Sequence, residues 1–275
     1  MDVILLGTGS PILDPRRAGP STLVRARGTS LLFDCGRGVL LRLAAVGAPP
    51  PSLAAVVLTH MHSDHITDLN DVITSQWVMT ATPKPLAIYG PKGARALVDA
   101  TLSMLQFDIG YRIAHHDDLN APPELTVTEL EPGDTVTIGA CQLTAQATDH
   151  SPVSPTLGYR VTCGEAVAAI AGDTIPCPGL DAICQGADVY VQTVIRDDLV
   201  KRVPSRRFQD ILDYHSTVEQ GGETAARTGV KTLMLTHYVP PLQPGQEDEW
   251  RALAAAHFKG EIVLGDDLTS VTIVD

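Results

Sequence analysis

Three things are scarce in this sequence: cysteine, long apolar runs and positive charge. The five cysteines are odd in number and show no Cys-x-x-Cys spacing; they are Cys35, Cys141, Cys163, Cys177 and Cys184. This argues against a disulfide framework and against a cysteine zinc site, so we expect small core residues. No apolar run has the length of a membrane span, and Met1 leads straight into a predicted strand without a basic leader. We therefore expect a cytoplasmic protein without a membrane partner.

Acidic residues outnumber basic residues in this chain. The 20 basic residues face 32 acidic ones, which leaves a net charge of −12. This is the wrong sign for a protein that wraps a large polyanion over much of its surface, so any contact with nucleic acid has to be local. The candidate substrate-binding cluster, diluted by Asp197 and Asp198, is Arg196, Lys201, Arg202, Arg206 and Arg207. The alternative is an ordinary solvated surface.

The chain has the composition of an ordinary folded protein. Hydrophobic residues make up 44% and charged residues 19%, which allows a buried core and argues against disorder. Although 275 residues is long for one average domain, two stacked sheets with flanking helices can form a unit of this size, so we expect a single domain over residues 1–275. No internal repeat or linker is visible, and the turn formers at 80–85 are expected to form a loop.

Hydrophobic patterning predicts strands and helices that alternate in two halves of an α/β chain. The strands expected in a first sheet are 2–7, 21–26, 29–34, 54–58 and 86–89. Those expected in a second sheet are 125–130, 135–147, 157–162, 166–171, 188–194 and 231–236. Helices are expected at 37–46, 93–107 and 217–228.

The most informative segment runs from Thr59 to His65, with the letters THMHSDH. It follows the apolar run 54–58, which predicts a buried strand that delivers the cluster to a sheet edge. Imidazole and carboxylate groups suit a divalent ion such as Zn²⁺. Four potential ligands this close cannot all serve one ion that also keeps an open position for chemistry, so the pattern favours two metals. The alternative is a polar loop that contains histidines by chance.

Two other motifs are weaker. Gly7-x-Gly9 suggests a dinucleotide loop, but Ile12 stands where the third glycine belongs, which excludes that assignment. The run of residues 115–118, two histidines and two aspartates, follows no predicted strand and indicates an exposed polar turn.

The motif His60-x-His62-x-Asp64-His65 resembles the signature of the metallo-β-lactamase superfamily. Further residues in the same order extend the resemblance over nearly the whole chain: Leu6-Gly7-Thr8-Gly9-Ser10-Pro11, Leu31-Leu32-Phe33-Asp34-Cys35-Gly36, His150, Ala171-Gly172-Asp173-Thr174 and Leu235-Thr236-His237. Within the superfamily the likeness is greatest to the ribonuclease Z group, through Asp149-His150-Ser151 with Gly158-Tyr159-Arg160 and through His215-Ser216-Thr217. The resemblance implies an αββα sandwich of two mixed sheets flanked by helices, a homodimer, and a centre of two Zn²⁺ ions, with Mn²⁺ as another possibility.

The resemblance also assigns roles to residues. It implies that His60, His62 and His150 hold one ion, that Asp64, His65 and His237 hold the other, and that Asp173 bridges them. Taken alone, His150, Asp173 and His237 are ordinary loop or turn residues, but each follows or ends a predicted strand, where sites are built.

The mechanism implied by this ligand set is hydrolysis by a hydroxide that bridges two metal ions. Asp64 would also orient the hydroxide, and His215 would contact a phosphoryl oxygen or protonate the leaving group. The alternative for His215 is a structural histidine beside a helix N-cap. Asp34, before Cys35-Gly36, is expected to anchor a ligand loop.

The chain departs from the ribonuclease Z pattern at one place. Enzymes of that group that process tRNA carry a long Gly/Pro-rich arm between the ligands that match His150 and Asp173, and here this interval is only 173 − 150 = 23 residues. We therefore expect a phosphodiesterase that prefers small diesters or short single-stranded RNA to tRNA. The alternatives are a true tRNA 3′-processing endoribonuclease, a hydrolase of aryl sulfates, lactones or β-lactams, and a non-catalytic binding scaffold.

Overall fold

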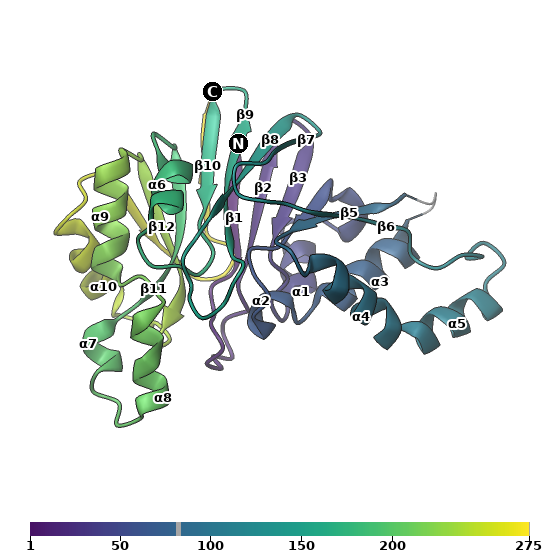
Figure 1. Cartoon of the computed structure of the whole chain (residues 1–275), viewed down its shortest axis with the longest axis horizontal. Helices are drawn as coiled ribbons and strands as arrows, with labels where there is room; N and C mark the ends of the chain where they lie inside the picture. Colours follow the sequence, from purple (N-terminus) through teal and green to yellow (C-terminus); the bar gives the residue numbers. More distant parts are fainter. Residues whose placement is uncertain (81–83, 275) are drawn as a thin grey trace.

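Leucine-rich and β-branched segments pair into two seven-stranded sheets within the part of the chain that the computed structural model describes, residues 1–80 and 84–274 (Figure 1). The first sheet has the order β14 (Ser270–Thr272), β1 (Asp2–Gly7), β2 (Ser21–Ala26), β3 (Thr29–Phe33), β4 (Ala55–Val57), β5 (Leu86–Gly90) and β6 (Leu125–Glu129). The second has the order β13 (Glu261–Leu264), β12 (Thr232–Val239), β11 (Val189–Ile195), β10 (Ala166–Ile170), β9 (Leu157–Cys163), β8 (Cys141–Ala147) and β7 (Thr135–Ile138). Both sheets combine parallel and antiparallel pairs, as expected.

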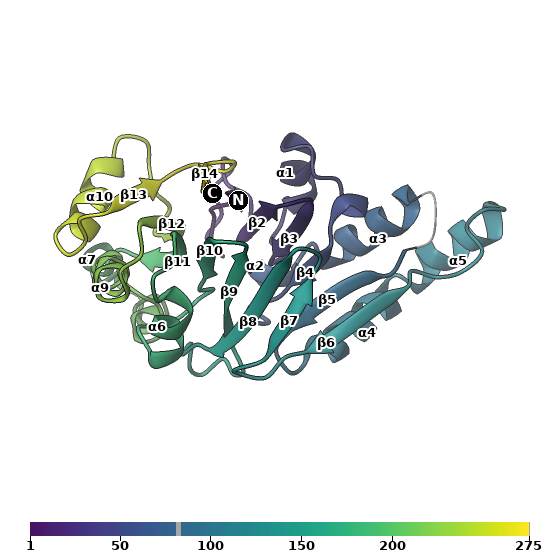
Figure 2. The same ribbon diagram turned by 90° about the horizontal axis from the view of Figure 1, so that it is seen from above.

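The two sheets face each other across the main core, and helices cover their outer faces (Figure 2). In β1, Val3 and Leu5 enter the core between the sheets, while Ile4 and Leu6 belong to the outer core, because side chains alternate along a strand. The helices α1 (Val39–Ala45), α3 (Leu69–Met79) and α4 (Ala94–Met104) bury apolar residues in the outer core of the first sheet. The helices α6 (Pro178–Cys184), α9 (Val218–Thr228) and α10 (Glu247–Ala255) bury apolar residues in the outer core of the second sheet. The predicted αββα sandwich is confirmed.

Several element boundaries differ from the prediction. Segment 125–130 was expected in the second sheet, but β6 pairs in parallel with β5 in the first, because α4 and α5 (Gln106–His115) form the crossover between them. The expected strand 135–147 is the hairpin β7–β8, whose turn at Gly139 has a positive φ of 56°. The expected helix 93–107 is divided at Leu105 into α4 and α5. The helices α3, α6 and α10 and the strands β13 and β14 were not predicted.

Two further expectations concern the loops. The loop at 80–85 falls partly on residues 81–83, which lie outside the described residues. Residues 115–118 are exposed and lie at the end of α5 and in the turn after it, in agreement with the predicted polar turn.

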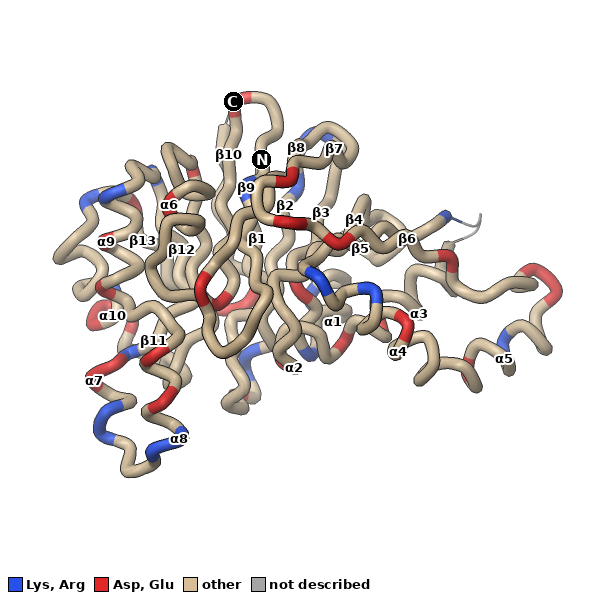
Figure 3. The backbone as a smooth tube through the Cα atoms, viewed as in Figure 1, with Lys and Arg blue, Asp and Glu red and all other residues tan. Residues whose placement is uncertain are grey.

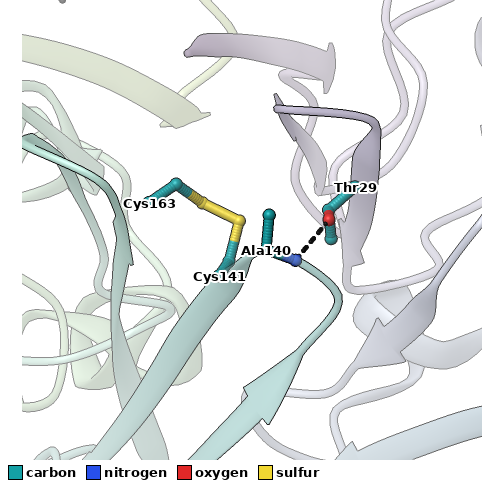
Figure 4. Close-up of a disulfide and its surroundings, with 4 residues drawn as sticks. All are labelled: Thr29, Ala140, Cys141 and Cys163. Carbon is teal, nitrogen blue, oxygen red and sulfur yellow. Dashed lines mark hydrogen bonds between the residues drawn. A yellow bond between two sulfur atoms is a disulfide. The ribbon is translucent and has the colours of Figure 1, made fainter.

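We expected five small core cysteines without a disulfide framework, and this expectation fails for three of them. Cys177 is free but only half-buried, and Cys141 and Cys163 are buried but not free. Cys141 and Cys163 form a disulfide across the neighbouring strands β8 and β9, with their Cα atoms 4.4 Å apart (Figure 4). Strand register, which sequence spacing does not reveal, brings the two residues opposite each other. Beside the bond, the amide of Ala140 donates to the hydroxyl of Thr29, and this contact joins the ends of the two sheets. Cys35 and Cys184 are free and buried, as expected.

The polar segments that follow β4, β8 and β10 meet at one edge of the sandwich, together with the end of β12. In parallel neighbours such as β10, β11 and β12, the carboxyl ends share an edge, where α/β sheets commonly bind ligands. Within the described ranges, no helix is long and apolar enough to cross a membrane.

Candidate metal centre

Each predicted ligand is delivered by the end of a strand or by the short helix beside it. His60 and His62 follow β4, and α2 (Ser63–Ile66) carries Asp64 and His65. Those residues are buried except for His62, which is half-buried.

The remaining three ligands arrive from the second sheet and are also buried. His150 follows β8, Asp173 follows β10, and His237 lies in β12 in the left-handed conformation, with φ of 54°. Gly172 has φ of 66°, and a Cβ atom there would lie only 2.8 Å from Cβ of Thr59. A glycine is therefore needed where Asp173 turns toward the histidines.

The first group of ligand atoms lies at the distances that a tetrahedral ion requires. Nδ1 of His62 is 3.1 Å from Nε2 of His60 and 3.2 Å from Nε2 of His150. Oδ2 of Asp173 lies 3.8 Å from Nε2 of both His60 and His150. A tetrahedral zinc ion bound at about 2.0 to 2.1 Å separates its ligand atoms by roughly 3.3 Å. The four side chains therefore fit one ion.

The second group has the same spacing and shares one oxygen with the first. Oδ2 of Asp64 lies 3.2 Å from Nε2 of His237 and 3.6 Å from Nε2 of His65. Oδ2 of Asp173 lies 3.4 Å from Nε2 of His65 and 3.5 Å from Nε2 of His237. Because the same oxygen of Asp173 also faces the first group, this carboxylate stands between the two sets of ligand atoms.

Hydrogen bonds at the far ring nitrogens fix which nitrogen faces the site. Nδ1 of His65 donates to Asp34, 2.7 Å away, and Nδ1 of His150 donates to the carbonyl of Tyr214, 2.8 Å away. The Thr59 hydroxyl donates to Asp34, so it accepts the proton of His60 Nδ1 at 2.9 Å. In the neutral form of all three rings, the Nε2 lone pair faces the site and can bind an ion. Burial alone would lower the pKa of His65, but the carboxylates of Asp173 and Asp34 outweigh it and raise that pKa well above its usual value, so an ion that binds there displaces a proton.

The charges in the site favour cation binding. Burial lowers the pKa of His60 well below its usual range and lowers the pKa of His150 to about 4, so both rings are neutral near pH 7. Burial alone would raise the pKa of Asp173, but His237 and His65 outweigh it and lower that pKa well below the usual value. An anionic carboxylate surrounded by imidazoles is the donor set that Zn²⁺ binds.

Among the described residues, three buried atoms of the predicted ligands lack a hydrogen-bond partner, namely Oδ1 of Asp173, Nε2 of His65 and Nδ1 of His237. A buried polar atom without a partner is costly unless a water or an ion satisfies it. Together with the tetrahedral spacing, these atoms show that the residues present fit a metal centre.

His215 lies against the same centre. Its Nδ1 donates to the carbonyl of Ile211 at 3.0 Å, and its Nε2 lies 3.3 Å from Oδ2 of Asp173. Its nitrogen is also close enough to Asp173 and His237 to complete a third possible group of metal ligands. The geometry thus allows His215 to act on a substrate or to serve as a ligand.

The predicted basic cluster is divided by the structure. Arg196 is buried, and its guanidinium donates to both carboxylate oxygens of Asp198 and lies 3.6 Å from Glu249. The other four cations, Lys201, Arg202, Arg206 and Arg207, are exposed.

Sequence reasoning missed two residues that support the site. The Thr59 hydroxyl accepts a hydrogen bond from His60 and donates one to Asp34, and so links the two side chains. The only sequence signal for Thr59 was its place at the start of the histidine motif. Tyr214 places its ring 5.1 Å from that of His150 and 4.8 Å from that of His215. Its only signal was adjacency to His215.

Comparisons with known proteins show what the chain is similar to. Residues 29–238 match the family described as the Beta-lactamase superfamily domain. The chain is 56% identical over 275 residues to the ribonuclease Z of Mycobacterium avium (strain 104), which covers 99% of this chain and 98% of that protein. It is 54% identical over 275 residues to the ribonuclease Z of Mycobacterium marinum (strain ATCC BAA-535 / M), with 99% of each chain covered.

Solved structures share the fold. The metallo-β-lactamase fold protein YhfI from Bacillus subtilis has a TM-score of 0.74 at 22% identity, with 98% of each chain covered. Human tRNase Z, short form, has a TM-score of 0.73 at 22% identity, with 100% of each chain covered. At this identity the likeness concerns the fold alone.

We predict that Asp34→Asn weakens metal binding by about 10- to 100-fold, the range typical of changes behind metal ligands. Asparagine cannot accept all three hydrogen bonds that Asp34 receives from Thr59 and His65. Competition with a chromogenic chelator measures the affinity. The control is Asp99→Asn, an exposed carboxylate on α4. Wild-type affinity in Asp34→Asn would contradict the anchoring role.

Proposed function

The chain belongs to the ribonuclease Z family of the β-lactamase superfamily, and on that basis we propose that it hydrolyses phosphodiester bonds in RNA at a centre of two metal ions. It is a metal-dependent hydrolase of the ribonuclease Z type. The observation that carries the two-ion proposal is Oδ2 of Asp173, which faces both groups of ligand atoms.

The residues that would hold the ions are those of the two groups described above. His60, His62 and His150 would hold one, Asp64, His65 and His237 the other, and Asp173 would contribute to both. Nitrogen and oxygen ligands in this number suit Zn²⁺, with Mn²⁺ as the alternative. When bound, the ions supply an activated water and neutralise charge on the phosphodiester.

The protein groups act around that chemistry. Asp64 is anionic, because the hydrogen bond from His237 and the charge of His65 outweigh burial and lower its pKa, so it can accept a hydrogen bond from the attacking water and orient it. His215 directs Nε2 toward Asp173 because Nδ1 is used by the Ile211 carbonyl. A protonated Nε2 would donate to a phosphoryl oxygen or to the leaving group.

The substrate proposal rests on the names of the relatives and on the short interval between His150 and Asp173. The strands β9, with 7 residues, and β10, with 5, occupy half of that interval, and this leaves only short turns for a docking arm. We propose that small diesters and short single-stranded RNA are better substrates than precursor tRNA. The name ribonuclease Z, which relatives of 54% and 56% identity carry, supports 3′ processing of tRNA as the second candidate.

We also propose that the protein is cytoplasmic, that it forms a single domain, and that it pairs with a second copy of itself. The helix α5 has no buried residue, and the large apolar side chains Met104, Phe107 and Tyr111 at α4 and α5 are 62%, 69% and 71% exposed. An exposed apolar surface of this kind supports self-association.

The two-ion proposal predicts close to two transition-metal equivalents per purified chain, measured by elemental analysis. Chelation should abolish hydrolysis, and added Zn²⁺ or Mn²⁺ should restore it. Asp173→Ala should lower metal content and activity more than alanine at His60, His62 or His150, because it removes a ligand from both ions. One equivalent in fully active protein would contradict the proposal.

The role of His215 is tested by His215→Ala. If the side chain acts on the substrate, this variant keeps both metal equivalents but loses about 10²-fold or more in turnover, as expected for a positioned acid or base. Loss of one metal equivalent would identify His215 as a ligand instead. Unchanged turnover with full metal content would show that His215 has only a structural role.

The substrate proposal is tested by comparing a precursor tRNA, a short single-stranded RNA and bis(p-nitrophenyl) phosphate at matched salt. We expect cleavage of the last two and slow cleavage of the tRNA. Efficient, position-specific removal of a tRNA 3′ trailer would establish the second candidate. Much higher activity on aryl sulfates, lactones or β-lactams would overturn phosphodiester hydrolysis.

A further inference from the structure

Residues 197–213 form a projecting segment, here called the finger, between β11 and His215. It consists of α7 (Asp197–Val200), α8 (Arg206–Gln209) and the 3₁₀ turn Asp210–Asp213. Its two ends are held together, because the amide of Ile195 donates to the carbonyl of Ser216 at 3.0 Å. Figure 1 shows the finger extending beyond the second sheet on the side where α2 lies. A compact loop with adjacent ends is a common carrier of function.

The finger is built to keep its shape. Val200 is buried with Ile195 and Val239, and Phe208, Ile211 and Leu212 pack against this small core. Across the finger, the side-chain amide of Gln209 donates to the carbonyls of Lys201, at 3.1 Å, and Val203, at 2.9 Å.

Arg196 fixes the base of the finger. Besides its bonds to Asp198, its guanidinium lies 5.7 Å from the ring centre of Trp250 in α10. These contacts hold the base of the finger against α10.

Charge is separated along the finger. The tip, residues 201–207, carries four cations and no carboxylate: Lys201, Arg202, Arg206 and Arg207. The finger's acidic residues lie toward the base: Asp197, Asp198, Asp210 and Asp213. Figure 3 shows Lys and Arg segments around the turn that joins α7 and α8. On a chain with a net charge of −12, such a tip is a local site for a polyanion.

The tip cations are accessible to a ligand. The side chain of Lys201 is 62% exposed and that of Arg202 is 74% exposed. Their ion pairs with Asp197 and Asp198 are of the exposed i,i+4 kind, which contributes little and exchanges readily for a phosphate. Arg206 and Arg207 are exposed on α8.

The base of the finger supports the metal centre directly. The Ile211 carbonyl accepts from His215, and the Tyr214 carbonyl, one residue past the finger, accepts from His150. From Arg207 to Asp213 the chain runs in helical turns with a rise of about 1.5 to 2.0 Å per residue, and two further residues lead to His215, so the span is roughly 20 Å or less. The tip therefore stands within a few nucleotides of a phosphodiester at the centre.

We propose that the finger docks single-stranded RNA that flanks the cleaved bond, through contacts of Arg206, Arg207 and their neighbours with backbone phosphates. The proposal rests on the proposed RNA hydrolysis. The finger would supply the grip for which the interval from His150 to Asp173 has no room. A flexible strand suits it better than a folded RNA, because one narrow basic tip contacts few phosphates at once.

The test compares Arg206→Gln/Arg207→Gln with Lys92→Gln/Lys259→Gln, an exposed pair elsewhere with the same change in charge. Binding of a fluorescent phosphorothioate oligoribonucleotide to metal-loaded protein is measured by anisotropy from 50 to 200 mM salt. Hydrolysis of unmodified RNA and of bis(p-nitrophenyl) phosphate is measured in parallel. The finger variant should bind on the order of tenfold more weakly, and its salt slope should be flatter by about 0.7 per lost phosphate contact. The control should bind like the wild type, and both variants should hydrolyse the small diester normally.

Three outcomes would overturn the proposal. The first is wild-type RNA binding and salt slope in the finger variant, and the second is equally weakened binding in the control variant. The third is a loss of small-diester hydrolysis in the finger variant that parallels its loss of RNA binding, which would show that the finger acts only by supporting His150 and His215. Failure of the proposed function looks different, because the wild type itself would then bind RNA without cleaving it. If the wild type bound a folded tRNA more tightly than the single strand, and the finger variant lost this preference, the ligand of the finger would be folded tRNA and not single-stranded RNA.

Discussion

The hydrogen bonds of one buried carboxylate, that of Asp34, hold the two halves of the centre in register. Asp34 accepts from His65 directly and from His60 through the Thr59 hydroxyl. Because each bond engages Nδ1 and turns Nε2 of its histidine toward the site, a single side chain orients one ligand of each proposed ion. Asp34 itself lies at the end of β3 with a φ of 58°, and its amide donates to the carbonyl of Val57. The first sheet thus fixes the orientation of both ligand groups.

The second sheet closes the centre at some conformational cost. Asp173 approaches over Gly172, where a Cβ atom would lie only 2.8 Å from Cβ of Thr59. His237 adopts a left-handed conformation that is unfavourable for a residue with a side chain. Such strained residues persist where the surrounding structure holds them. Here Tyr238, next to His237, is fully buried and its ring packs 5.4 Å from that of Trp250. Ligands on two rigid sheets need little rearrangement on binding an ion.

Chemistry and substrate docking are separated in this fold. The proposed metal ligands lie on strand ends and on α2, whereas the proposed RNA contacts lie on the finger that joins β11 to His215. A change in the length or charge of that segment would alter which RNA is held while leaving the ligand geometry intact. The finger carbonyls that orient His150 and His215 limit this freedom at its base, where we expect the backbone to tolerate less change than the tip.

Hydrophobic patterning in the sequence predicted the two sets of strands, and the resemblance to the metallo-β-lactamase superfamily implied the layer architecture and the proposed metal ligands. Alternating apolar residues mark strands such as β1, and the ligand types stand in family order where strands end. The capping of α9 by Thr217 and Gln220 is likewise a local signal. Tertiary structure alone decided matters of register and distance. It placed β6 in the first sheet, brought Cys141 opposite Cys163, and paired Arg196 with Asp198 and Glu249. It also joined Asp34 to His60 through Thr59, since contacts between residues distant in the chain depend on how the sheets stack, and no local pattern encodes that.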